Sequence, residues 1–318
     1  MKKYTLILML ALVVSCQKTT MTAHLSDHDI LTPELFLPHI VTNEIDQEFG
    51  MTISPIDAKT ILFTRRIGDE KQRIYETRYN NGQWNTPQIV SFSNDRDESP
   101  HFSKDGRTVY FGSERPIPNQ TNLGGFDMNV WKTEWVNGAW TKPIPLSNTI
   151  NKVQIEGENW PSSNVSHFVT SDDITFYTGT QVRGTKGLDI YQTTYDGADF
   201  KALKKLSSAI NREDKWEYAP IISADGNYLF TQIYNREDGI GGDDIFVSKK
   251  DVEGKWMPSK NLGELINTNM NECPAAMTSD GKYFFFTRDK KDNPEEYDGI
   301  SSIYIIETQA LKLNELFK

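Results

Sequence analysis

Cysteine and histidine are scarce in this sequence of 318 residues, which contains two cysteines and five histidines. Cys16 and Cys273 cannot form the disulfide framework of a small secreted domain, so each needs its own explanation. The histidines show no metal-site spacing, and the glycine pairs at 124–125 and 241–242 precede no predicted helix that could hold a phosphate. We therefore expect neither a metal ion nor a cofactor.

Basic residues are outnumbered by acidic ones, with 34 Lys and Arg against 44 Asp and Glu, so the formal net charge is −10. Removing a leader that carries Lys2 and Lys3 would make it −12, since −10 − 2 = −12. Such a chain has no counterion-release drive toward a phosphate backbone, so a nucleic-acid partner is not expected. An anionic membrane surface would also repel it, so membrane attachment requires an anchor.

The first sixteen residues have the organisation of a lipoprotein signal peptide. Lys2 and Lys3 form a basic start, and the apolar run from Leu6 to Val14 is too short to span a bilayer but suits a signal-peptide core. The segment ends in Val-Val-Ser-Cys, which resembles the lipobox of bacterial lipoproteins. That resemblance implies cleavage before Cys16 and acylation of its thiol and new amine. Ordinary signal cleavage nearby, with a free Cys16, is the alternative.

These features predict three regions: a signal peptide over 1–15, a flexible tether with lipidated Cys16 over 16–30, and one folded domain over 31–318. Surface-exposed lipoproteins of the Bacteroidota usually carry acidic residues directly after the cysteine. Residues 17–20 read QKTT instead. We therefore expect an outer-membrane, lipid-anchored protein that faces the periplasm.

An internal repeat organises the rest of the chain. Its clearest copies span 98–115, 217–236 and 272–288, and divergent copies span 49–66 and 167–179. Each clear copy starts with Glu and soon a Pro, followed by an apolar strand, a Ser/Thr-x-Asp-Gly turn and a strand rich in Tyr and Phe. Asp and Gly suit such hairpin turns. A Gly-rich loop, a third strand, another turn and a fourth strand complete most copies.

Four strands per repeat predict the blades of a β-propeller. The turn residues at 54, 103, 170, 223 and 278 recur at roughly the spacing of four-stranded blades. The fifth copy ends near its third strand, and residues 31–42 look like its missing fourth strand, which would remove two exposed sheet edges. We predict an all-β fold, a single propeller of four-stranded antiparallel blades, with five blades closed by an N-terminal strand. Six blades are the alternative, because the interval between the second and third copies holds extra chain.

The repeats resemble the PD40 repeat, the WD40-like family of TolB and its relatives. The matching residues are SKDG at 103–106, YFGSER at 110–115 and GGFD at 124–127, with equivalents in other copies, and the resemblance covers roughly 43–310. It implies a propeller in the periplasm or envelope with a binding or scaffolding role. No segment resembles the N-terminal domain of TolB, so the resemblance transfers fold better than function.

Charged residues recur where each repeat begins and between its second and third strands. These positions lie at the same end of an antiparallel meander, so we expect them to gather on one face. This candidate binding face comprises Glu98, Arg115, Asp127, Glu158, Asp189, Glu217, Arg236, Asp244, Glu272 and Arg288, with Glu48 and Arg65 in the first repeat. It is either a mouth that recognises a ligand or a set of ion pairs and hydrogen bonds between blades. Repetition favours the ion pairs, because a catalytic acid and base need unequal surroundings.

Two functions from different classes follow. The favoured one is a non-catalytic envelope lipoprotein that binds a protein or glycan, or acts as a scaffold, through the propeller face. The alternative is a polysaccharide hydrolase or lyase with carboxylates at the channel, where an acid and base would break the repeat symmetry at about 5–10 Å. No Ser-His-Asp order or nucleophile elbow is present. His101 is expected in the wall or core, and Cys273 is expected to fill space on an inner strand.

Overall fold

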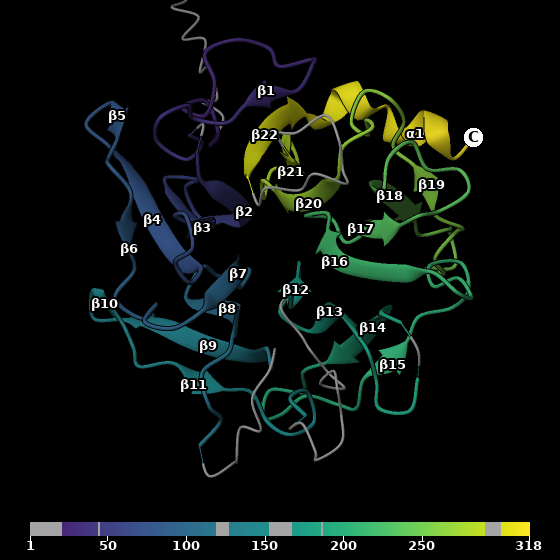
Figure 1. Cartoon of the computed structure of the whole chain (residues 1–318), viewed down its shortest axis with the longest axis horizontal. Helices are drawn as coiled ribbons and strands as arrows, with labels where there is room; N and C mark the ends of the chain where they lie inside the picture. Colours follow the sequence, from purple (N-terminus) through teal and green to yellow (C-terminus); the bar gives the residue numbers. More distant parts are fainter. Residues whose placement is uncertain (1–20, 44, 119–126, 153–166, 186, 290–299) are drawn as a thin grey trace, which may run out of the picture.

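The computed structural model describes residues 21–43, 45–118, 127–152, 167–185, 187–289 and 300–318 (Figure 1). Nearly all regular structure in these ranges is β-strand, and the short helices η2 (Thr308–Leu311) and α1 (Leu313–Leu316) lie near the C-terminus. None of the helices in the described ranges is long and apolar enough to cross a membrane. The predicted all-β class is confirmed.

The described strands form sheets of nine, five, four and four strands around a central axis, which is a propeller-like arrangement (Figure 1). We divide these strands by the sequence repeat into five consecutive units. Unit one comprises β2 (Gln47–Ile53), β3 (Thr60–Arg66), β4 (Arg73–Asn80), β5 (Gln83–Trp84) and β6 (Gln88–Ile89). Unit two comprises β7 (Asp97–Phe102), β8 (Thr108–Ser113), β9 (Asn129–Val136), β10 (Ala139–Trp140) and β11 (Ile144–Pro145). Unit three comprises β12 (Val169–Thr170), β13 (Thr175–Thr180), β14 (Asp189–Thr194) and β15 (Lys204–Lys205).

Unit four comprises β16 (Trp216–Ile222), β17 (Tyr228–Tyr234), β18 (Asp243–Lys249) and β19 (Lys260–Asn261). Unit five comprises β20 (Glu272–Met277), β21 (Tyr283–Asp289) and β22 (Ser301–Glu307), to which the N-terminal β1 (Glu34–Leu35) is added. β1 runs antiparallel to β22, with Glu34 opposite Ile305 and Leu35 opposite Tyr304. The first and last parts of the chain therefore share one sheet.

The Ser/Thr-x-Asp motif closes the hairpin between the first two strands of a unit. In unit two, Ser103 Oγ donates to Asp105 Oδ1 at 2.7 Å and accepts from Thr108 N at 2.9 Å. The same Asp105 oxygen accepts from Arg107 N at 3.0 Å. Equivalent Ser/Thr-to-Asp bonds occur at Thr170, Ser223 and Thr278. The motif is thus a turn device that satisfies its own backbone.

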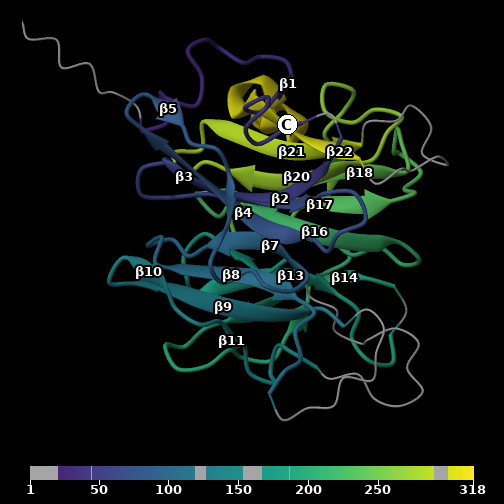
Figure 2. The same cartoon turned by 60° about the vertical axis from the view of Figure 1, so that its left-hand side comes forward.

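Apolar side chains fill the spaces between neighbouring units, whose sheets stack beside one another (Figure 2). Leu62 of unit one packs in a cluster with Phe111 of unit two. Phe230 of unit four lies against Phe284 of unit five, with ring centroids 4.7 Å apart. Because each inner sheet is covered on both faces, its strands are apolar on both faces, as in the fully buried run Tyr283–Phe286.

The first strand of each unit is its innermost, and these strands contact one another around the axis. β2 contacts β7 and β20, and β16 contacts β12 and β20. β7 is linked to β12 through His101, whose Nε2 accepts a hydrogen bond from Thr170 N at 3.0 Å. Gly50 of β2 adopts φ +46°, and a Cβ there would lie 2.9 Å from Ser99 Cα. Glycine at this position therefore permits the close approach of β2 and β7.

The segment 21–30, expected as part of a flexible tether, packs against units one and five. Leu25 and Ile30 are buried in the same apolar cluster as Phe285. Thr22 Oγ1 donates to Asp280 Oδ2 at 2.8 Å, and Glu307 N donates to Ile30 O at 2.8 Å. Although this segment is mostly polar, Leu25 and Ile30 attach it to the core. The described part of the fold therefore begins before residue 31.

Candidate functional site

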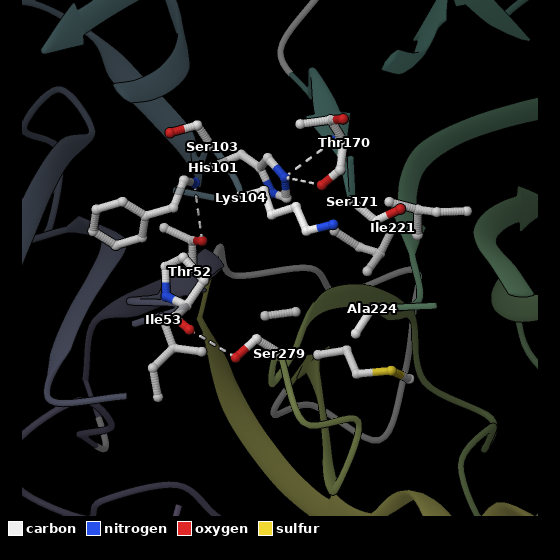
Figure 3. Close-up of a pocket in the computed structure, with 15 residues that line it drawn as sticks. Thr52, Ile53, His101, Ser103, Lys104, Thr170, Ser171, Ile221, Ala224 and Ser279 are labelled. Atoms are coloured by element: carbon white, nitrogen blue, oxygen red, sulfur yellow. Dashed lines mark hydrogen bonds between the residues drawn. The ribbon is translucent and has the colours of Figure 1, made fainter. Parts of the chain in front are cut away.

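A cavity of about 220 Å³ lies at the hairpin-turn end of the innermost strands (Figure 3). Every unit contributes to its lining, and representative residues along the chain are Thr52, His101, Thr170, Ile221 and Ala276. The cavity therefore lies where the five units meet. It is formed by the repeat architecture rather than by an insertion in one unit.

The chemistry of this cavity is apolar and cationic. Ile53, Phe102 and Met277 supply apolar surface, and the described residues that line the cavity include no Asp or Glu. Lys104 extends into the space between units (Figure 3). Burial lowers the pKa of His101 to about 4, so its imidazole is neutral at pH 7. Lys104 is consequently the charged side chain among the described lining residues, which supply no acid–base pair of carboxylates.

The opposite end of the strands, which we call the charged end, holds the carboxylates that begin the repeats. In unit four, Glu217 of β16 lies opposite Ile233, and Ile233 lies opposite Asp244 of β18. In unit one, Glu48 lies opposite Arg65. The described charged residues that begin the repeats, and those between the second and third strands, thus lie at the same end of their sheets, as predicted.

Several of these groups form buried ion pairs. Arg65 Nε donates to Glu48 Oε1 at 3.1 Å, and Arg288 Nε donates to Glu272 Oε1 at 2.8 Å. Both guanidinium groups also donate to main-chain carbonyls and lie over aromatic rings of their own unit. Arg115 does the same, but its partner is Asp97, at 2.6 and 2.7 Å. A buried charge needs such a partner.

The pairing in unit two differs from the sequence-based expectation. Glu98 lies near Arg96, with Nε to Oε2 at 3.5 Å, rather than near Arg115. Asp97 is six residues before the turn residue Ser103, as Glu48 is before Ser54, so Asp97 is the equivalent carboxylate. Burial raises the pKa of both Asp97 and Glu98. Choosing the Glu that precedes Pro in each repeat therefore selects, in unit two, the residue one position after the equivalent carboxylate.

The other predicted residues are also engaged. Asp127 accepts from Asn129 Nδ2 at 3.1 Å, Asp189 pairs with Lys205 at 2.7 Å, and Asp244 accepts from Ile240 N at 2.6 Å. Arg236 donates to Ser259 Oγ at 2.6 Å and pairs with Asp238. Cys16 and Glu158 lie outside the described residues. The described members of the predicted face are buried or half-buried at the charged end.

Glu217 differs from Glu48 and Glu272 because Ile233, rather than an arginine, lies opposite it in the strand pairing. Its side chain is fully buried, Oε1 accepts from Arg212 N at 3.0 Å, and Oε2 has no partner among the described residues. The position that Arg65 and Arg288 occupy in units one and five is Ile233 in unit four. Burial raises the pKa of Glu217 to about 7.

Sequence reasoning missed a second repeated polar contact. Asn211 Oδ1 accepts from Ile190 N at 2.7 Å, and its Nδ2 donates to Ile190 O and Leu206 O. Asn151 and Asn267 make the same clamp on Val130 and Ile245. An Ile-Asn dipeptide marks all three positions, at 150–151, 210–211 and 266–267. These asparagines fasten the chain between units to the third strand.

A polar cluster at the charged end of units four and five has no counterpart in the other described units. Tyr218 OH donates to Asp243 Oδ1, and Asp243 N donates to Asn271 Oδ1 at 3.1 Å. Asn271 Nδ2 in turn donates to Asp289 Oδ2 at 2.8 Å. Burial raises the pKa of Asp243 to about 6, and burial also raises the pKa of Cys273 beside it. No described group of three His, Cys, Asp or Glu side chains could hold a metal ion.

Comparison with solved structures finds the same fold at low sequence identity. A structure described as a glycoside hydrolase has a TM-score of 0.53 and 13% identity, covering 91% of this chain and 94% of that one. A thermostable family-43 glycoside hydrolase has a TM-score of 0.51 and 9% identity, covering 83% and 90%. These likenesses show the fold alone.

TolB from Acinetobacter baumannii has a TM-score of 0.49 and 14% identity, covering 85% of this chain and 56% of that one. This chain thus spans a little over half the length of that protein. No family model matches the sequence. No curated protein matches it either.

Proposed function

We propose that this chain is a lipid-anchored envelope protein whose propeller binds a protein or glycan without catalysis. One observation carries the proposal: the axial cavity joins all five units, and its described lining residues carry no carboxylate. Hydrolysis of a glycoside ordinarily needs two carboxyl groups, whereas recognition needs only shape, apolar contact and a few polar groups. The repeat carboxylates that face an arginine are held in ion pairs at the opposite end of the strands, which further favours binding over chemistry.

The proposal includes a ring of five blades of the PD40 type, closed by β1. The pairing of β1 with β22 supports closure, as does the parallel bridge from Gln47 of β2 to Ser301 of β22. Ser301 Oγ also donates to Glu48 O at 3.0 Å. A ring closed in this way leaves only the short outer strands of the blades as sheet edges.

The proposal also includes acylation of Cys16 and a place on the periplasmic side of the outer membrane. Its support is the lipobox-like Val-Val-Ser-Cys and the lack of acidic residues directly after it. Two or more acyl chains give a stable anchor, at about 0.8 kcal/mol per buried methylene. The net negative charge of the chain leaves the lipid as the attractive contact with an anionic bilayer.

Affinity capture with matched variants tests the binding function. The tagged full-length lipoprotein is purified from detergent-solubilised envelope of cells that express the wild type, Lys104→Glu, Ala224→Trp or Lys255→Glu. Lys104 and Ala224 line the cavity, whereas Lys255 is an exposed lysine in the turn between β18 and β19, outside the described cavity lining. Co-purified proteins and glycans are quantified by mass spectrometry. We expect Lys255→Glu to retain the wild-type ligand and both cavity variants to lose it, whereas retention by both cavity variants would refute the assignment.

A polysaccharide hydrolase or lyase is the second candidate, favoured by the polar cluster of units four and five. Asp243 and Asp289 break the repeat symmetry, and the raised pKa of Asp243, about 6, suits a general acid. The test is release of reducing ends or unsaturated products from polysaccharides by the full chain and by Asp243→Asn and Asp289→Asn. Turnover by the wild type that both variants abolish would replace the binding proposal with this one.

A further inference from the structure

An exposed aromatic pair lies at the charged end of unit four. Trp216 begins β16 and Tyr234 ends β17, with exposed fractions of 54% and 50%. The two rings are neighbours, with centroids 6.4 Å apart and planes inclined by 46°. The Cδ1–Nε1 edge of Trp216 lies beside Gly187, where a Cβ would come within 3.1 Å of Nε1. About half of the surface of each aromatic residue is open to solvent.

The carboxylate of Asp243 extends this aromatic pair into a row of three side chains, which we call the aromatic row. Trp216 lies opposite Tyr234, and Tyr234 lies opposite Asp243, so the three side chains cross β16, β17 and β18 in one line. Strands are spaced about 4.8 Å apart, so the row is about 10 Å long. Tyr218 OH donates to Asp243 and fixes its carboxylate, and Asn271 fixes its main chain. The acceptor at the β18 end of the row is thus held in place before any ligand arrives.

Among the described residues the aromatic row occurs in unit four, and the equivalent first position of unit three lies outside them. At the positions of Trp216 and Tyr234, unit one has Gln47 opposite Arg66. In unit five, Asn271 takes the place of Trp216 and Asp289 takes the place of Tyr234. The main-chain N–H of Asp289 donates to the carbonyl of Asn271. A contact needed to hold blades together would recur, as the ion pairs and the asparagine clamps do. Two large aromatics exposed side by side, and not repeated in the other units where these positions are described, instead mark a surface that meets a ligand.

We propose that Trp216, Tyr234 and Asp243 form a subsite for a neutral saccharide. The C–H face of a pyranose is apolar and faintly positive, so it stacks on the negative face of an aromatic ring. Its hydroxyl groups need fixed acceptors and donors, which the Asp243 carboxylate, the indole N–H and the phenol OH provide. The row is long enough for a disaccharide. A polyanionic glycan would be repelled by a protein with a net charge of −10.

This inference goes beyond the proposed function, because the subsite and the axial cavity lie at opposite ends of the same strands. β16 begins at Trp216, in the subsite, and ends at Ile222, in the cavity lining. A glycan could hold the protein in place while the cavity takes its own ligand. Loss of ligand binding at one site should therefore leave binding at the other site unchanged.

Titration calorimetry on the full chain, in a detergent without a sugar headgroup, tests the subsite. The probes are mannohexaose, xylohexaose, cellohexaose and maltohexaose, each with the wild type, Trp216→Ala, Tyr234→Ala and Asp243→Asn. Ile174→Ala is the control, because Ile174 is 57% exposed on unit three at the hairpin-turn end. We expect at least one hexasaccharide to bind the wild type and the control alike, and each subsite variant to weaken it by about tenfold or more.

Three results would overturn the subsite. They are failure of all four hexasaccharides to bind, wild-type affinity in both Trp216→Ala and Tyr234→Ala, and loss of a captured protein rather than of a sugar in those variants. Melting curves of the variants exclude misfolding, since the two aromatic side chains are exposed and their removal should not shift the transition. Capture through the cavity by Trp216→Ala, measured in parallel, separates failure of the subsite from failure of the proposed function.

Discussion

Glu217 should make the stability of this protein depend on pH in a direction opposite to that of an ion-paired carboxylate. Its carboxyl group is fully buried and faces Ile233 where equivalent residues face arginine. Burial raises its pKa from the usual 4.5 to about 7. The folded protein therefore favours the protonated form. That contribution to stability is complete below about pH 4.5 and is lost as the pH rises through 7.

The magnitude follows from linkage between protonation and folding. A rise of about 2.5 pKa units corresponds to about 3 kcal/mol at 1.36 kcal/mol per unit. Glu217→Gln removes the ionisation and keeps the volume. Its buried amide N–H₂ lacks a partner, which costs about 1 kcal/mol at every pH. We expect the variant to be about 2 kcal/mol more stable than the wild type at pH 8 and about 1 kcal/mol less stable at pH 4.

Urea unfolding of both proteins at pH 4 and pH 8, followed by fluorescence, measures this difference directly. The matched control is Glu48→Gln, since Glu48 is equally buried but pairs with Arg65 at 3.1 Å. That variant leaves an arginine without its nearest carboxylate and should lose about 3 kcal/mol at pH 8. The reasoning about burial is refuted if Glu217→Gln differs from the wild type by the same amount at both pH values.

Three further predictions concern the ion pairs, the ring and the anchor. Arg115→Ala removes the cation that pairs with the buried Asp97 and should lower the free energy of unfolding by about 3–5 kcal/mol. The control Arg107→Ala, at an exposed turn, should lower it by less than about 1 kcal/mol. Equal losses for the two variants in urea titrations would refute the buried pair. Deletion of residues 31–42 removes the strand beside β22 and should cost several kcal/mol, roughly an edge strand's packing, so an unchanged melting temperature would show that β1 does not close the fold. Cys16→Ala should move the protein from the membrane pellet to the soluble fraction, and its retention in the pellet would contradict lipidation.

Local patterns were sufficient to predict the units of the fold. The Ser/Thr-x-Asp turns and the strands rich in Tyr and Phe are short-range signals, and each hairpin formed where the motif placed it. The register was less predictable. A β-bulge follows the carboxylate of the first strand in units one, two, four and five, so it does not distinguish unit two. Unit two has Asp97 at the position of Glu217, with Glu98 directly after it. Selecting the Glu therefore chose Glu98, although Asp97 makes the ion pair with Arg115.

The candidate sites depend on contacts between distant segments, which a single sequence does not reveal. Lys104 reads as an ordinary turn residue and becomes part of a cavity only when the turns of the other units surround it. In the sequence, Trp216 and Tyr234 are indistinguishable from strand aromatics that pack in a core. The pairing of β16 with β17 instead places both residues at a solvent-exposed end of the sheet. Leu25 was hidden within a polar segment. In each case the signal was tertiary packing rather than composition.

The central claim is that the axial cavity binds a ligand in the envelope, and site-specific photo-crosslinking in living cells tests it most directly. A photoreactive phenylalanine analogue is placed at Ala224, in the cavity lining, or at Val252, a fully exposed residue in a turn outside it. Ultraviolet light joins the side chain to whatever lies against it. We expect a discrete higher-mass adduct from position 224, absent from position 252 and absent when Lys104→Glu is added. No adduct at position 224, or the same adduct from both positions, would contradict the account.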